Sequence, residues 1–137
     1  LCVEDALDAV NWIESIGGLR ASIDRCDENL LTVTDWVQNS SWASFLADDE
    51  RNRSNTSVCL KFIDPWFLNL QNDHQGAIPE QISGLLEREG VAFDINGYRD
   101  APPGLRIWTG ATVQNQDLTY LLPWLDWAYE QVKSSFH

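Results

Sequence analysis

Two stretches at the start of the chain repeat apolar residues at steps of three and four, which is the spacing of one helix face. Gly17 and Gly18 interrupt this spacing, and it resumes directly after them. The pattern predicts two consecutive helices with a hinge or kink at the glycines, the second ending near residue 39. The apolar positions are Val3, Leu7, Val10, Ile13 and Ile16 in the first helix, and Leu19, Ile23, Cys26, Leu30, Val33 and Val37 in the second.

The middle of the chain changes period. Residues 42–55 are polar and irregular, which predicts a loop of mixed charge. In residues 56–64 apolar and polar positions alternate, with Val58, Leu60 and Phe62 on one side, so we expect a strand with one buried face. A helical stripe then appears around Pro79, which suits a first helical turn, and Gly90 suits the position just past the helix end.

The last third predicts two short strands, at 91–95 and 104–110, joined through the Pro102-Pro103 turn. Residues 115–136 predict a closing helix that Pro123 has to kink or restart. The whole order predicts an α+β fold with helices packed on one face of a small antiparallel sheet. We divide the chain into residues 1–38, a long interrupted helix leading into the domain, and residues 39–137, a small α+β domain.

Length and charge narrow the classes of partner. The 137 residues carry a net charge of −12, which repels phosphate backbones and anionic lipid, so we expect neither nucleic acid nor membrane as a partner. No apolar run reaches the roughly 20 residues of a spanning helix, and we expect a cytoplasmic protein. The chain begins inside a helical pattern without Met, which we interpret as one piece of a longer protein.

The three cysteines, Cys2, Cys26 and Cys59, are odd in number and widely spaced, which favours reduced, mostly buried cysteines over a disulfide or zinc site.

The scarce positive charge near the proline turn is the main chemical signal. Arg99 and Arg106 flank that turn, and the strand period points Arg106 and Trp108 away from the core-facing Leu105 and Ile107. A planar guanidinium held by a strand can bind a carboxylate through two parallel hydrogen bonds. Two fixed arginines would suit a small ligand with two anionic groups.

The competing interpretation is structural: Arg106 pairs with one of the chain's 21 acids, and Arg99 pairs with Asp94 or Asp100. The ligand interpretation requires an Arg106 side chain that is free of acidic neighbours. Trp66 and Trp108 lie near the expected sheet ends, where they could edge a pocket.

Other chemistry is sparse in this sequence. The two histidines, His74 and His137, have no nucleophile or metal-ligand partner nearby and are expected at the surface. Lys61 and Lys133 are the only lysines that could form a Schiff base, and neither has a suggestive context. There is no glycine-rich phosphate loop, HExxH or GxSxG motif. We therefore predict no catalytic, cofactor-binding or metal-binding residue within this chain.

Three segments carry a resemblance to a known family. The string "YRDAPPGLRIWTGATVQNQDLTYLLPWLDWAYEQV" closely resembles the C-terminal end of the phosphoserine aminotransferases. "RSNTSVCLKF" and "VEDALDAVNWIESIGGLRASIDR" resemble the same family, so the likeness extends over essentially the whole chain. These proteins are class V, fold-type-I transaminases that depend on pyridoxal 5'-phosphate.

The resemblance implies a division of labour. A large N-terminal domain would hold pyridoxal 5'-phosphate and its Schiff-base lysine, and this chain would be the small C-terminal domain that closes the active site. The reaction would move an amino group between glutamate and 3-phosphohydroxypyruvate in serine biosynthesis, with phosphoserine as the product. The resemblance also implies a homodimer at full length.

The resemblance also implies roles for individual residues. Arg106 matches the arginine that holds the substrate α-carboxylate, and it lies beside Trp108. Arg99, preceded by Tyr98 where the family has a histidine, matches the arginine that contacts the substrate phosphate. Two other interpretations remain open from the residues alone: a free-standing small-ligand-binding or regulatory module, and an interaction domain that uses exposed tryptophans.

Overall fold

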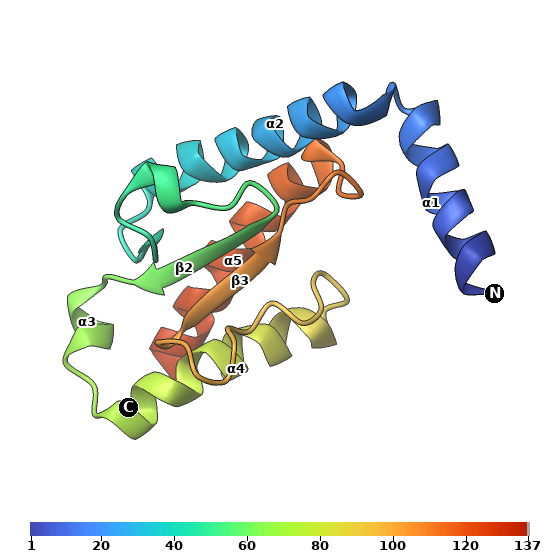
Figure 1. Cartoon of the computed structure of the whole chain (residues 1–137). Helices are drawn as coiled ribbons and strands as arrows, with labels where there is room; N and C mark the ends of the chain where they lie inside the picture. Colours follow the sequence, from blue (N-terminus) through green and yellow to red (C-terminus); the bar gives the residue numbers. More distant parts are fainter. Residues whose placement is uncertain (137) are drawn as a thin grey trace.

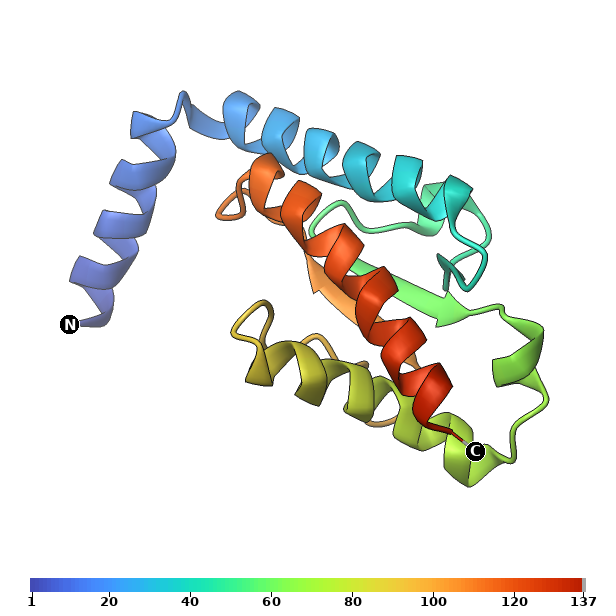
Figure 2. The same ribbon diagram turned by 180° about the vertical axis from the view of Figure 1, so that it is seen from behind.

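A three-stranded antiparallel sheet forms the centre of the computed structural model, which describes residues 1–136; His137 and its expected surface position lie outside them. The strands are β1 (Ala43–Phe45), β2 (Ser57–Phe62) and β3 (Gly104–Trp108), with β2 in the middle. Helices cover one face of this sheet, as Figures 1 and 2 show from its two sides. The predicted α+β fold is confirmed.

The helical layer is built around the last helix. α5 (Asn115–Ser135) crosses the sheet and contacts α2 (Gly18–Asn39) on one side and α4 (Asn72–Arg88) on the other (Figure 2). The short α3 (Pro65–Leu68) connects β2 to α4. α1 (Cys2–Ser15) projects from the far end of α2 (Figure 1). None of the helices among residues 1–136 is long and apolar enough to cross a membrane.

The core lies between the sheet and α5. Alternate residues of each strand face the helices, as their period of two requires. Aromatic rings dominate one end of this core: the Trp42 ring stacks on that of Tyr129 with centroids 4.3 Å apart, and Phe62 packs against both. Such offset stacking adds to the burial of apolar surface. The strand residues that face the core are Ala43, Phe45, Val58, Leu60, Phe62, Leu105 and Ile107.

The break between the first two helices is confirmed. Gly17 and Gly18 have φ angles of +110° and +74°, a left-handed conformation that favours glycine, and α1 ends before them. α1 contains no buried residue, so the apolar positions predicted there, such as Leu7 and Val10, are exposed within the described chain. Of the three free cysteines, Cys26 is buried and Cys59 half-buried, but Cys2 on α1 is exposed.

The expectation of a loop over residues 42–55 is wrong in part. Residues 43–45 form β1, which pairs with residues 60–62 of β2, and a 3₁₀ turn follows at Glu50–Asn52. The strand has only three residues, so its alternation is too short to separate from the polar run that follows it. Ala43 and Phe45 point into the core, and this burial stabilises the pairing.

Two further boundaries differ from the prediction. α4 begins at Asn72, so Pro79 lies buried inside the helix and not in its first turn. The start was mispredicted because the first turns of the helix consist mostly of polar residues and show no apolar stripe. Its end was predicted correctly, since Gly90 has a φ of +69° just past the last turn. The strand expected at 91–95 is absent; Asp94 adopts a left-handed φ of 53°, which breaks the extended conformation, and only Asn96 bridges to Leu105.

The closing helix does not restart at Pro123, since α5 runs without interruption from Asn115 to Ser135; of the two predicted effects of this proline, the restart is wrong and the kink stays a prediction. Proline removes one backbone donor and leaves the carbonyl four residues earlier without its helical partner. Here that carbonyl belongs to Thr119, and both residues are exposed. Water can therefore satisfy the carbonyl, which explains why the helix tolerates this proline.

Two buried polar groups tie the sheet to the helices. Asn29, fully buried on α2, donates from Nδ2 to the carbonyls of Thr109 and Val113, both at 3.0 Å, and so holds the chain just after β3. Asp64 caps α3 by accepting from the Trp66 amide, and its other oxygen accepts from Tyr129 Oη at 2.9 Å and Lys133 Nζ at 2.7 Å.

Asp64 and Lys133 stabilise each other in their charged forms. Burial raises the pKa of Asp64, but the hydrogen bonds from Lys133, the Trp66 amide and Tyr129 outweigh burial and hold the pKa below its ordinary value. Burial and the neighbouring Asp64 carboxylate both raise the pKa of Tyr129. The hydrogen bond to Asp64 also raises the pKa of Lys133. This cluster fixes the end of β2 against α5.

We expect Gly104→Ala to lower the free energy of unfolding by about 1–3 kcal/mol, the range for an overpacked site. A methyl group at position 104 would collide with the backbone carbonyl of Leu60 on the neighbouring strand. Gly84→Ala, within α4, is the matched control: its methyl would meet only the Arg88 side chain at 3.6 Å. Urea unfolding should show the control stabilised by about 0.4–1 kcal/mol; equal effects for both variants would contradict this account.

We expect Asp64→Asn to destabilise the fold by about 1–3 kcal/mol at pH 7, because a buried, hydrogen-bonded charge pair is lost. Since the pKa of Asp64 is lowered in the fold, its contribution is present above about pH 3.9 and is lost as the pH falls through the folded-state value. The free energies of unfolding of wild type and variant should therefore converge as the pH falls below about 3.9 and through the folded-state pKa of Asp64. Asp8→Asn, on exposed α1, controls for the change in net charge.

Candidate functional site

The sheet face opposite the helices carries the predicted arginine. Leu105 and Ile107 are buried, whereas Arg106 and Trp108 point to the open face, as their alternation predicts. Arg106 lies opposite Cys59 in the register, and Trp108 lies opposite Ser57. Within residues 1–136 no helix crosses this face (Figure 1). The Arg106 side chain is 22% exposed and that residue is rooted in a hydrogen-bonded strand, which restricts its motion.

The segment before the proline turn runs beside β3 and brings an acid to the arginine. The Arg106 amide donates to the Ile95 carbonyl at 2.8 Å, which fixes the segment against the strand. Arg106 Nη2 then donates to Asp94 Oδ2 at 3.2 Å and lies 3.5 Å from the Asp94 carbonyl. The expectation that Arg106 has no acidic neighbour is therefore wrong, and the competing prediction that Arg106 pairs with one of the chain's own acids is confirmed. Asp94 pairs with Arg106 and not with Arg99. Sequence reasoning missed this pairing because the left-handed conformation of Asp94, whose side chain contacts Arg106, is not visible in the hydrophobic spacing.

Apart from Nη2, the Arg106 guanidinium makes no hydrogen bond within residues 1–136. Its Nε is buried and has no hydrogen-bond partner among the described residues. The guanidinium carbon lies 4.7 Å from the centroid of the exposed Tyr98 ring, a cation–π contact on one side. A buried donor without a partner is costly, and such groups call for an explanation in a ligand or a functional role.

A cavity of ≈ 420 Å³ opens at Arg106. Its walls combine the arginine with apolar side chains of the 91–95 segment, β3 and α5, and with the carboxylates of Asp94 and Asp117. Trp108 is 52% exposed, and its Nε1 donates to Thr112 Oγ1 at 3.0 Å, which fixes the ring at the edge of the cavity. Sequence reasoning identified Arg106 and Trp108 but missed the wall residues Phe93, Asp94, Asp117 and Leu121.

Arg99 lies in a different place. It is exposed and lines a second hollow of ≈ 410 Å³, formed by the proline turn and the start of α4, together with Glu80. Arg99 has no ion pair among residues 1–136. Tyr98 connects the two hollows, since its ring contacts Arg106 and it also lines the Arg99 hollow. The structure therefore places the two predicted arginines near one another but not in one cavity.

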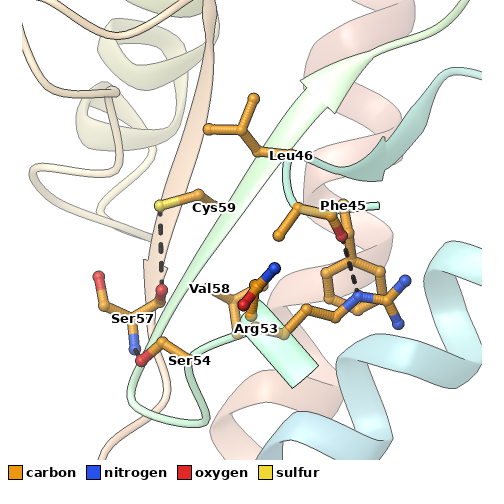
Figure 3. A pocket seen from close by; sticks show the side chains of 9 residues that line it. Phe45, Leu46, Arg53, Ser54, Ser57, Val58 and Cys59 are labelled. Atoms are coloured by element: carbon orange, nitrogen blue, oxygen red, sulfur yellow. Dashed lines mark hydrogen bonds between the residues drawn. The ribbon is translucent and has the colours of Figure 1, made fainter. Parts of the chain in front are cut away.

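A third hollow of ≈ 280 Å³ lies under the loop between β1 and β2, and Figure 3 shows the side chains that line it. Arg53 closes it: the guanidinium lies 4.1 Å from the Phe45 ring and donates to the carbonyls of Ala47 and Asp48, both at 3.2 Å. It also contacts Glu50 at 3.3 Å. These donors are engaged within the loop, so Arg53 stabilises the loop.

Groups that could hold a cofactor or metal are few. Lys61 Nζ contacts Asp48 at 2.6 Å, and Lys133 is bound to Asp64, with its pKa raised, so neither is a free amine suited to a Schiff base. His74 is exposed against the Phe136 ring, and Trp66 packs on Tyr129 and Phe136. The part of the chain that the structure describes contains no cluster of metal ligands.

Comparison with solved structures defines the class of fold. The structure of a phosphoserine aminotransferase from Bacillus circulans subsp. alkalophilus matches 93% of this chain with a TM-score of 0.67 and 19% identity. The match covers 30% of that protein. The structure of mouse CSAD matches 85% of this chain, and 25% of its own, with a TM-score of 0.59 and 15% identity. The fold thus occurs in an aminotransferase as 30% of a larger chain.

Sequence comparison then specifies the family. The phosphoserine aminotransferases of Methanosarcina mazei and Methanosarcina barkeri are each 43% identical to this chain over 133 residues, or 97% of it. The chain spans about a third of the length of these relatives, since the match covers 33% of each. No protein-family model matches the chain. The chain is homologous to phosphoserine aminotransferases over nearly its whole length, and the resemblance predicted from its motifs is confirmed.

Proposed function

We propose that this chain is the C-terminal small domain of a phosphoserine aminotransferase and that it binds the anionic groups of the substrates. The observation that carries the proposal is Arg106, which lines a cavity between the 91–95 segment, β3 and α5 and whose buried Nε lacks a hydrogen-bond partner among the described residues. The homology to phosphoserine aminotransferases supports the reaction class.

The proposed substrates share the group that Arg106 would recognise. Glutamate and 3-phosphohydroxypyruvate both carry an α-carboxylate, and a guanidinium held by a strand matches that group through two parallel hydrogen bonds. Tyr98 supports one side of the guanidinium, and Trp108 forms an edge of the cavity. These contacts would orient the substrate through its carboxylate and leave its reacting carbon free.

Arg99 would serve the phosphate of the phosphorylated substrate. It is exposed in the neighbouring hollow, and Tyr98 lies between it and Arg106. A substrate bound to Arg106 by its carboxylate would extend past Tyr98 toward Arg99. Selection between a phosphorylated and a non-phosphorylated substrate would then depend on the Arg99 side.

The remaining parts of the reaction belong to the rest of the protein in this proposal. Pyridoxal 5'-phosphate, which supplies the electron sink for amino transfer, would be held with its lysine by a large N-terminal domain. The small domain would close over that site, in a homodimeric cytoplasmic enzyme of serine biosynthesis. This chain alone would be inactive, because the cofactor and its lysine would lie in the large domain.

In the full-length enzyme we expect Arg106→Ala to raise KM for both glutamate and the phosphorylated substrate by about 30-fold or more. Truncating one partner of a buried, hydrogen-bonded charge pair costs roughly 2–5 kcal/mol. Arg106→Lys keeps the charge but loses the fork, so its effect should be intermediate. Arg20→Ala, in an exposed pair on α2, controls for the charge change. Unchanged KM for glutamate in Arg106→Ala would refute the carboxylate role.

We expect Arg99→Ala to raise KM for phosphoserine much more than KM for glutamate, because only the first carries a phosphate. Steady-state kinetics with each substrate varied in turn measures this difference, and glutamate provides the internal control. Similar losses with both substrates would instead assign Arg99 a structural role in the proline turn.

A further inference from the structure

We propose that Asp94 is an internal competitor of the substrate carboxylate: it pairs with Arg106 until an amino or oxo acid displaces it, and so sets the affinity of the site. This inference rests on the proposed carboxylate role of Arg106. Asp94 is the residue that the guanidinium contacts directly, through Oδ2 at 3.2 Å. Its side chain ends in a carboxylate, the same chemical group that a substrate would present to Arg106.

The geometry of the guanidinium makes the two carboxylates rivals. A fork with a carboxylate uses either Nη1 with Nη2 or Nε with Nη2, so both arrangements include Nη2. Asp94 already engages that nitrogen, through its carboxylate and, more weakly, its carbonyl. A second carboxylate at the same nitrogen would meet a like charge at close range, which is unfavourable. Nη2 carries two N–H groups and could still donate to a second carboxylate, but that carboxylate would lie beside the Asp94 charge. A substrate is therefore bound more favourably when the Asp94 side chain swings aside.

The Asp94 side chain is held weakly enough to move. It is 89% exposed, and its one ion pair with another described residue is with Arg106. Asp64 shows the contrast: its side chain is 12% exposed and its carboxylate accepts hydrogen bonds from Trp66, Tyr129 and Lys133. Exposed ion pairs contribute little to stability, whereas removing a partner from a buried cluster is costly. The contact at Asp94 is thus suited to displacement and the one at Asp64 is not.

The surroundings favour an organic acid as the displacing group. The cavity beside Arg106 is walled by the apolar side chains of Phe93 and Leu121 and edged by Trp108, which suit a carbon skeleton. The buried Nε of Arg106 offers a donor that Asp94 does not use. A substrate carboxylate that reached both Nε and Nη2 would satisfy this donor as well, and so would bind better than the acid it replaces.

The test compares Asp94→Asn with Asp100→Asn in the full-length enzyme. Asparagine adopts a left-handed φ as readily as aspartate, so the first variant removes the charge without forcing a change at φ 53°. Asp100 is exposed in the same connection and has no ion pair among the described residues, so the second variant matches the charge change. KM and kcat are measured for glutamate and phosphoserine, and again in an Arg106→Lys background.

We expect Asp94→Asn to lower KM for both substrates by about two- to five-fold with kcat unchanged, because a ground-state competitor is removed. Asp100→Asn should leave KM near the wild-type value, and the gain from Asp94→Asn should be smaller in the Arg106→Lys background, where the charge is kept but the fork is lost.

The other outcomes overturn the inference. Equal decreases for both asparagine variants would indicate a general charge effect, and an increased KM for Asp94→Asn would make Asp94 a residue that positions Arg106. An unchanged KM for Asp94→Asn beside a raised KM for Arg106→Lys would refute the competition alone. An unchanged KM for Arg106→Lys and Arg106→Ala would refute the proposed function itself.

Discussion

The pleat of β3 determines where the positive charge of this domain lies. Leu105 and Ile107 are buried against the helices, and because successive strand residues point to opposite faces, Arg106 must point the other way. Burial of two large aliphatic side chains, each worth about 1.5–3 kcal/mol, holds the register against a one-residue slip. A slip would bury the guanidinium and expose both aliphatic residues. The orientation of Arg106 is thus maintained by the core.

Buried polar contacts complete this frame at the two ends of the sheet. Asn29 holds the chain just past β3 by two hydrogen bonds to backbone carbonyls, and Asp64 joins the end of β2 to α5. Both groups are directional, so they specify one arrangement of the sheet on the helices where apolar packing alone would allow several. The pair of Asp94 and Arg106 is less firmly held. The Asp94 carboxylate is exposed, and the buried Nε of Arg106 has no hydrogen-bond partner among the described residues.

Periodic segments were predictable, and the irregular ones were not. The strand at Ser57–Phe62, the glycine break after α1 and the closing helix follow from spacing alone. β1 escaped prediction because its three residues gain their stability from pairing with β2, a contact distant in sequence. The direction of Arg106 could be predicted from the strand period, but its partner could not: Asp94 reaches it through a single left-handed residue, and this conformation leaves no trace in hydrophobic spacing.

Unlike α2, α4 and α5, the first helix, α1, is not stabilised by burial of its side chains. α1 has 14 residues and buries none of them, so its hydrogen bonds receive little help from tertiary packing. Isolated helices shorter than about 12–15 residues are marginal in water. The helical population of α1 in solution should therefore depend strongly on what surrounds it. Its amide hydrogens should exchange faster than those of α5, whose inner face is buried.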